Sequence, residues 1–221
     1  FPPDFRWGVA TASHQVEGDN TNNQWWQWEQ QPSHIAQGHT SAMACNWWEN
    51  AEADFDRAAA MNLDTMRLSL EWSRIEIAPG HIDTGALDRY VEMIQALLDR
   101  GIEPMVTLHH FSDPMWFTDR GGWTSPDAVP YFTRFVEQVV PALRDDVTLW
   151  CTLNEPTVYA YMGYLAGVFP PGRRDFKAAT TVIRTMLKAH AAAYKRIHQL
   201  QPDAQVGLAH HLRIFDPARP H

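Results

Sequence analysis

Cysteine is scarce in this chain of 221 residues, with only Cys45 and Cys151 present. Two cysteines cannot supply the disulfide framework that stabilises small secreted domains. Cys151 lies in an apolar run, which is typical of an inert buried thiol. This low cysteine content fits a reducing compartment, and we expect a cytoplasmic protein.

Long hydrophobic runs and an excess of positive charge are also missing. No apolar stretch approaches the roughly 20 residues that a membrane-spanning helix requires, and no signal peptide is recognisable. The formal net charge is −8, which argues against nucleic acid or an anionic membrane as a partner. Hydrophobic residues make up 45% of the chain, enough for a large core in a soluble protein.

The segments that are present alternate between strand-like and helix-like patterns. Five apolar runs predict strands, at residues 7–12, 65–70, 104–108, 147–151 and 205–210. Segments with apolar residues at steps of three and four separate most of them, as in Leu87, Tyr90, Val91 and Ile94, and predict helices with one buried face. Strands alternating with helices indicate a parallel sheet with crossover connections.

The fold class follows from what surrounds the predicted strands. No Gly-x-Gly-x-x-Gly turn follows the first strand, as a doubly wound dinucleotide-binding sheet would have. Prominent polar residues instead follow four different strands, which favours an α/β barrel. A closed barrel of this type needs about eight strands, whereas this chain supplies about five. The chain also begins at Phe1 without a methionine, so we expect one piece of a longer polypeptide.

The fourth predicted strand runs into Thr-Leu-Asn-Glu-Pro at residues 152–156. Pro156 disfavours helix at Glu155 and predicts an extended backbone there. A glutamate delivered at the carboxyl end of a strand is what barrel enzymes use for catalysis. From spacing alone, however, Glu155 could equally be a cap for the helix that begins near Pro156.

The motif at 152–156 resembles the acid/base motif of family 1 glycoside hydrolases, the β-glucosidase family. Three more stretches resemble family motifs in the same order: residues 5–18 the N-terminal signature, 66–75 the second-strand motif and 107–114 the third-strand motif. The resemblance covers nearly the whole chain, while the family's full length is roughly twice as long. We therefore expect residues 1–221 to be the N-terminal half of a single (β/α)8 TIM barrel catalytic domain.

The resemblance implies a retaining β-glycosidase that hydrolyses terminal β-linked sugars by double displacement, without a metal or other cofactor. Glu155 would be the acid/base, and Asn154 would hold the sugar 2-hydroxyl. Gln15 and His110 would hydrogen-bond the hydroxyls of the glycone. Phe111 stands where the family often has tryptophan.

The second catalytic carboxyl group of the family lies in a Thr-Glu-Asn-Gly-like motif on the seventh strand, and no such motif occurs here. Arg67 corresponds to the arginine that pairs with this nucleophile and keeps it ionised. We therefore expect the segment alone to be inactive. Its expected partners are a small β-glycoside substrate and the C-terminal half of the barrel, on the same polypeptide or a separate fragment.

Several of these features allow more than one interpretation. The chain could be a non-catalytic sugar-binding or assembly half-barrel. Gln15 could be an ordinary exposed amide, and the adjacent His109 and His110 could suggest a metal site, although neighbours on a strand point to opposite faces. His14 replaces a tyrosine common in the family, and the nearby polar loop carries Trp25, Trp26 and Trp28. The resemblance assigns neither feature a role.

Overall fold

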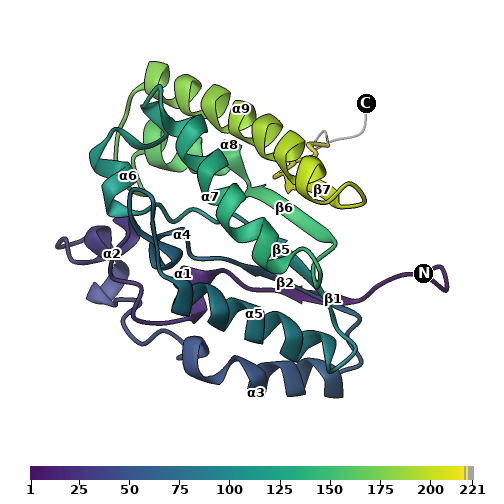
Figure 1. Cartoon of the computed structure of the whole chain (residues 1–221). Coiled ribbons are helices and arrows are strands. Elements are labelled where there is room, and N and C mark those ends of the chain that lie inside the picture. The colour runs from purple at the N-terminus through teal and green to yellow at the C-terminus, as the bar shows by residue number, and fades with distance from the viewer. Residues whose placement is uncertain (217, 219–221) are drawn as a thin grey trace.

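A five-stranded parallel sheet lies at the centre of the computed structural model, which describes residues 1–216 and 218 (Figure 1). Its strands are β1 (Gly8–Ala10), β2 (Thr65–Ser69), β5 (Glu103–Thr107), β6 (Leu149–Asn154) and β7 (Gln205–Ala209). They lie side by side in this order, and every neighbouring pair is parallel. The five predicted strands and their parallel arrangement are thereby confirmed.

Four long helices connect the strands and lie along one side of the sheet (Figure 1). They are α3 (Trp47–Ala60), α5 (Thr84–Leu98), α7 (Ala128–Leu143) and α9 (Phe176–Leu200). Asp83 caps α5 by accepting a hydrogen bond from the Ala86 N–H at 3.0 Å, as its residue type favours. No helix in the described residues combines the length and hydrophobicity needed to cross a membrane.

Shorter elements fill the connections at the carboxyl ends of the strands. The helices are α1 (Ser13–Val16), α2 (Gln24–Glu29), α4 (Trp72–Ile75), α6 (Met115–Asp119) and α8 (Pro156–Ala160), with the helical turns η1 (Ala36–Gly38), η2 (Gly122–Thr124) and η3 (Tyr161–Ala166). A small hairpin joins β3 (Glu76–Ala78) to β4 (His81–Ile82). The tryptophan-rich segment after β1 is therefore partly helical rather than a plain loop.

The two faces of the sheet have different surroundings because side chains alternate along each strand. Met66, Leu68 and Val106 are buried in the core. On the alternate positions, Arg67 is in register with Met105, Met105 with Leu149, and Leu149 with Gln205. These four residues line one open cavity of about 300 Å³. The row they form marks the interior side of the barrel.

An aromatic cluster fixes the helices against the sheet. Trp72 is buried and packs on Phe135 with ring centroids 5.2 Å apart, and on Phe132 at 5.7 Å. Its indole N–H donates to Glu76 Oε2 at 2.8 Å, which satisfies the one polar atom of that ring. The cluster therefore joins α4 and α7 through buried apolar surface.

Phe132→Ala tests the contribution of this cluster. Removing a fully buried phenylalanine leaves a cavity between Trp72 and Trp123, and we expect the free energy of unfolding to fall by about 3–5 kcal/mol. The measurement is equilibrium urea unfolding of the variant and the unmodified protein. Phe176→Ala is the control, since Phe176 is 75% exposed and its loss should cost far less. Equal stability of the two variants would contradict the proposed role of the cluster.

Candidate active site

Most of the residues that the sequence singled out follow the carboxyl ends of strands. Gln15 lies on α1 after β1, His110 follows β5, and Glu155 follows β6 directly. Because the strands are parallel, these ends meet at one edge of the sheet, where barrel enzymes place their active sites. Arg67 lies within β2 itself.

Glu155 adopts an unusual backbone conformation. Its φ is 44° and its ψ is 59°, in the left-handed region, so the prediction of an extended backbone was wrong. The residue turns the chain from β6 into α8 while its N–H donates to the Ala209 carbonyl at 2.8 Å. Such a conformation is costly for a residue other than glycine and is concentrated at functional sites.

Glu155 occupies the N-cap position of α8, as its spacing also allowed, but its side chain makes no capping hydrogen bond. The side chain is 33% exposed, and its Oε1 lies 3.5 Å from His211 Nδ1. The carboxyl group is therefore accessible from the carboxyl edge of the sheet. His211 is a neighbour that the sequence did not assign to the site.

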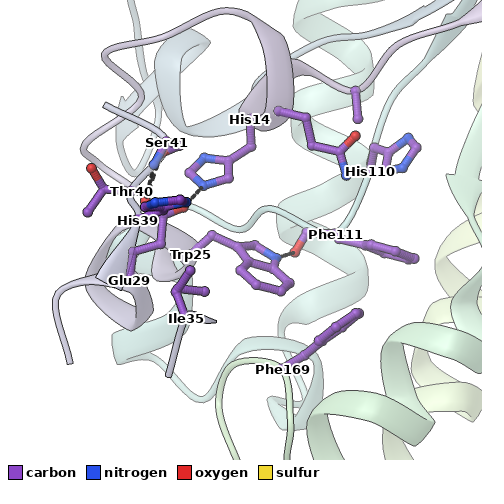
Figure 2. Close-up of a pocket in the computed structure, with 12 residues that line it drawn as sticks. His14, Trp25, Glu29, Ile35, His39, Thr40, Ser41, His110, Phe111 and Phe169 are labelled. Carbon is purple, nitrogen blue, oxygen red and sulfur yellow. Dashed lines mark hydrogen bonds and ion pairs between the residues drawn. The ribbon is translucent and has the colours of Figure 1, made fainter. Parts of the chain in front are cut away.

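A pocket of about 370 Å³ opens beside Gln15 and His110 (Figure 2). Its lining combines aromatic and polar side chains: Ala12, His14, Gln15, Trp25, Glu29, Ile35, His39, Thr40, Ser41, His110, Phe111 and Phe169. Three of the predicted site residues, Gln15, His110 and Phe111, are thus brought together. Arg67, Asn154 and Glu155 do not line this pocket.

His110 is held in its neutral form. Burial, followed by the positive charge of Arg67 and the proximity of His109, lowers the pKa of His110 to about 4. A neutral imidazole has one donor and one acceptor nitrogen. Its Nδ1 is buried and has no hydrogen-bond partner among the described residues, so this nitrogen is closed to a ligand, while the ring itself lines the pocket.

His109 has entirely different surroundings from His110. Its Nε2 lies 2.9 Å from Asp113 Oδ1, and its ring packs edge-on against Trp123. Asp113 also accepts hydrogen bonds from Trp123 Nε1 at 3.0 Å and from the Tyr159 hydroxyl at 2.5 Å. His109 therefore belongs to a buried network beneath the site. In the described part of the chain, His, Cys, Asp and Glu residues nowhere gather in threes as a metal site would need.

Comparison with known proteins identifies the family. The model of glycosyl hydrolase family 1 matches residues 1–221, which is the whole chain. The chain belongs to glycosyl hydrolase family 1. β-Glucosidase A of Acetivibrio thermocellus is 35% identical over 99% of this chain and 50% of its own length.

Solved structures agree with this assignment. The family 1 β-glucosidase from Thermotoga maritima has a TM-score of 0.96 at 32% identity, with 100% of this chain and 51% of that chain covered. The Thermotoga enzyme has also been solved in complex with deoxynojirimycin. This chain spans about half the length of the relatives it matches, and its five parallel strands are part of the family 1 TIM barrel.

In this family 1 chain, the structure accounts for His14. The Asn23 amide is oriented by the Trp26 N–H, which donates to its Oδ1 at 2.9 Å. Asn23 Nδ2 therefore faces His14 Nδ1 at 3.1 Å as a donor, which leaves the imidazole proton on Nε2. That nitrogen donates to Glu29 Oε1 at 2.7 Å. His14 thus joins α1 to α2 at the wall of the pocket.

Glu29 is the other half of this contact, and no pattern in the sequence pointed to it. Burial alone would raise the pKa of Glu29, but hydrogen bonds from His14 and Ser41 outweigh burial and lower it. Ser41 donates through its hydroxyl at 2.9 Å and also through its backbone N–H. Glu29 is therefore ionised at neutral pH and holds residues far apart in the sequence together.

Arg67 projects into the cavity on the interior side of the barrel rather than into the pocket. No carboxylate within the described residues lies at ion-pair distance from it. Cys151 lines the same cavity, and burial raises the pKa of its thiol, as expected for an inert cysteine. A guanidinium without an anionic partner has donors available for a carboxylate from outside the described residues.

Glu17 carries the most perturbed carboxyl group near the site. It is buried, accepts hydrogen bonds from the Tyr90 hydroxyl at 2.6 Å and from Asn20 Nδ2 at 2.9 Å, and has Arg74 Nε at 3.4 Å. Burial raises the pKa of Glu17 to about 7, against the opposing effect of Arg74. The folded state therefore binds this proton more tightly than the unfolded chain does.

This raised pKa predicts a loss of stability as pH rises. Glu17 stabilises the fold fully below its ordinary pKa of about 4.5 and loses that contribution as pH rises through about 7. The difference between these two pKa values corresponds to roughly 3 kcal/mol in the free energy of unfolding. Urea unfolding should give a lower free energy of unfolding at pH 8 than at pH 5. In Glu17→Gln most of this difference should be absent. An unchanged pH dependence in Glu17→Gln would contradict the assignment.

Proposed function

We propose that the complete protein is a retaining β-glycosidase of the β-glucosidase type. By complete protein we mean the polypeptide or assembly that joins this chain to the strands that close the barrel. Residues 1–221 are the N-terminal half of its single catalytic domain. The observation that carries the proposal is the position of Glu155, directly after β6 at the edge where Gln15 and His110 line a pocket.

Hydrolysis by this route needs two carboxyl groups about 5–5.5 Å apart across the scissile bond. Glu155 protonates the leaving oxygen while the nucleophile, a glutamate outside residues 1–221, attacks the anomeric carbon. Glu155 then removes a proton from a water molecule that attacks the anomeric carbon, and the bond to the nucleophile carboxylate breaks, so that the sugar leaves with its β configuration retained. The accessible side chain of Glu155 can serve both steps because it does not cap α8.

The glycone is bound by groups that this chain supplies. Gln15 offers an amide donor and acceptor, and the neutral imidazole of His110 lines the same pocket. Phe111 forms an apolar part of the pocket wall, and its backbone is left-handed with φ of 70°. Asn154 ends β6 beside Glu155 and holds the sugar 2-hydroxyl, a contact that strengthens in the transition state.

Arg67 pairs with the nucleophile. Its position in the row of interior side chains leaves its donors without a carboxylate among the described residues. A neighbouring guanidinium lowers the pKa of a carboxyl group and keeps it ionised. The nucleophile needs that ionised state in order to attack the anomeric carbon.

Glu155→Ala in the complete protein tests the acid/base role. A nitrophenolate leaves with little protonation, whereas a sugar alcohol needs it. We expect Glu155→Ala to abolish hydrolysis of cellobiose almost entirely while 4-nitrophenyl β-glucoside still forms the covalent intermediate. Added azide should then restore turnover and yield a β-glucosyl azide, because a small anion attacks the intermediate without a general base.

Product analysis by nuclear magnetic resonance decides the outcome. Glu137→Ala is a suitable control, since Glu137 lies on the outer helix α7 and should retain normal turnover without an azide effect. Full activity of Glu155→Ala on cellobiose, or formation of an α-azide, would show that Glu155 is not the acid/base.

A second prediction concerns the segment by itself. Residues 1–221, purified free of any other chain, should not hydrolyse 4-nitrophenyl β-glucoside, because the nucleophile is outside them. Addition of the remaining part of the barrel should restore turnover. Clear release of nitrophenolate by the pure segment would overturn the placement of the nucleophile.

A further inference from the structure

A single buried carboxylate connects three segments at the carboxyl edge of the sheet. Glu71 follows β2 and is completely inaccessible to solvent. Its Oε2 accepts hydrogen bonds from the Ser13 hydroxyl at 2.9 Å and from the Ser112 hydroxyl at 2.8 Å. Its Oε1 accepts from the Ser73 hydroxyl at 2.6 Å. One carboxylate therefore contacts the segments that follow β1, β2 and β5.

Two of these serines belong to the segments that bear the proposed glycone-binding side chains. Ser13 begins α1 and lies two residues before Gln15, and Ser112 lies two residues after His110. Between His110 and Ser112, Phe111 has a left-handed backbone with φ of 70°. A strained conformation of this kind persists only where its surroundings hold it, and the contact of Ser112 with Glu71 is such a restraint.

Glu71 is itself anchored from behind. Its backbone N–H donates to the Tyr90 hydroxyl at 2.8 Å, and that hydroxyl donates to Glu17 Oε1 at 2.6 Å. Tyr90 is fully buried on α5. The Ser13 N–H is also bound, to the Ser69 hydroxyl at 2.8 Å at the end of β2. The carboxylate is thus attached to the rigid strand and helix rather than to a free loop.

A carboxylate is an expensive group to bury. No cation lies within ion-pair distance of Glu71 in the described residues, so three hydroxyl donors and the more distant Ser73 N–H at 3.4 Å compensate for its desolvation. An apolar residue would pack at lower cost but could not bind hydroxyls. A carboxylate oxygen can accept from two donors at once, which is the geometry that joins Ser13 to Ser112 here.

From these contacts we propose that Glu71 is a positioning residue that sets the separation of Gln15 from His110. It touches no substrate and acts through Ser13 and Ser112. The inference rests on the proposed glycosidase function, because its consequence is the fit of the glycone between those two side chains. Displacements of about 1 Å at a binding site reduce rates by up to about 100-fold, so small shifts of these segments matter.

The experiment compares buried carboxylate variants of the complete protein. Glu71→Gln keeps the size of the side chain but replaces one acceptor oxygen with an NH₂ donor. We expect kcat/KM for 4-nitrophenyl β-glucoside to fall by about 10- to 100-fold per folded molecule, with weaker binding of deoxynojirimycin as a glycone mimic. Glu76→Gln is the matched control, because Glu76 is equally buried but contacts Trp72 and Arg134 instead. It should lose stability without this change in kcat/KM.

A second pair of variants keeps the test decisive if Glu71→Gln does not fold. Ser13→Ala and Ser112→Ala each remove one hydroxyl donor, and each should lower kcat/KM, whereas Ser112→Thr, which retains a hydroxyl, should recover most of the activity. A double-mutant cycle of Ser13→Ala with Gln15→Ala should be non-additive, since both act on the same contact with the sugar.

The outcomes separate the two proposals. If the unmodified complete protein does not hydrolyse β-glucosides, the proposed function fails. If it does, and the Glu71 and serine variants keep normal kcat/KM and inhibitor binding while only their melting temperatures change, Glu71 is a stabilising residue and the positioning proposal is overturned.

Discussion

The parallel register of the five strands is the constraint on which the rest of this structure depends. It aligns Arg67, Met105, Leu149 and Gln205 in one row on the interior side. It also brings the carboxyl ends of β1, β2, β5 and β6 to one edge. A shift of one residue in any strand would turn its side chains to the opposite face. The apolar face under the helices opposes such a shift, because Leu68 and Val106 would leave the core.

At that edge, buried carboxyl groups hold short segments in place. Glu17 and Glu71 are both inaccessible to solvent, and the Tyr90 hydroxyl connects them. Glu29 does the same for α1 and the segment that contains Ser41. Each carboxyl group receives hydrogen bonds from at least two residues of the connecting segments or helices. Each therefore fixes a connection that has little regular secondary structure of its own. The proposed binding residues Gln15 and His110 stand on segments held in this way.

Much of the fold could be predicted from the sequence because its signals are local. Alternating strand and helix patterns predicted five parallel strands, and the ends of the predicted strands differ from the observed ones by only a residue or two at most positions. The backbone of Glu155 was missed for a physical reason. Pro156 disfavours a helical conformation at Glu155, but the left-handed alternative depends on the Ala209 carbonyl, which is more than 50 residues away.

The sequence alone determined the five parallel strands, the family motifs and the candidate side chains Gln15, Arg67, His110, Phe111, Asn154 and Glu155. These follow from hydrophobic periodicity and from short motifs, which are properties of neighbouring residues. Only the tertiary structure decided that Gln15 and His110 share a pocket, that His14 contacts Glu29, and that Glu71 joins Ser13 to Ser112. Those contacts connect residues 15 to 95 positions apart, and their geometry is set by strand register and helix packing, which no local pattern records.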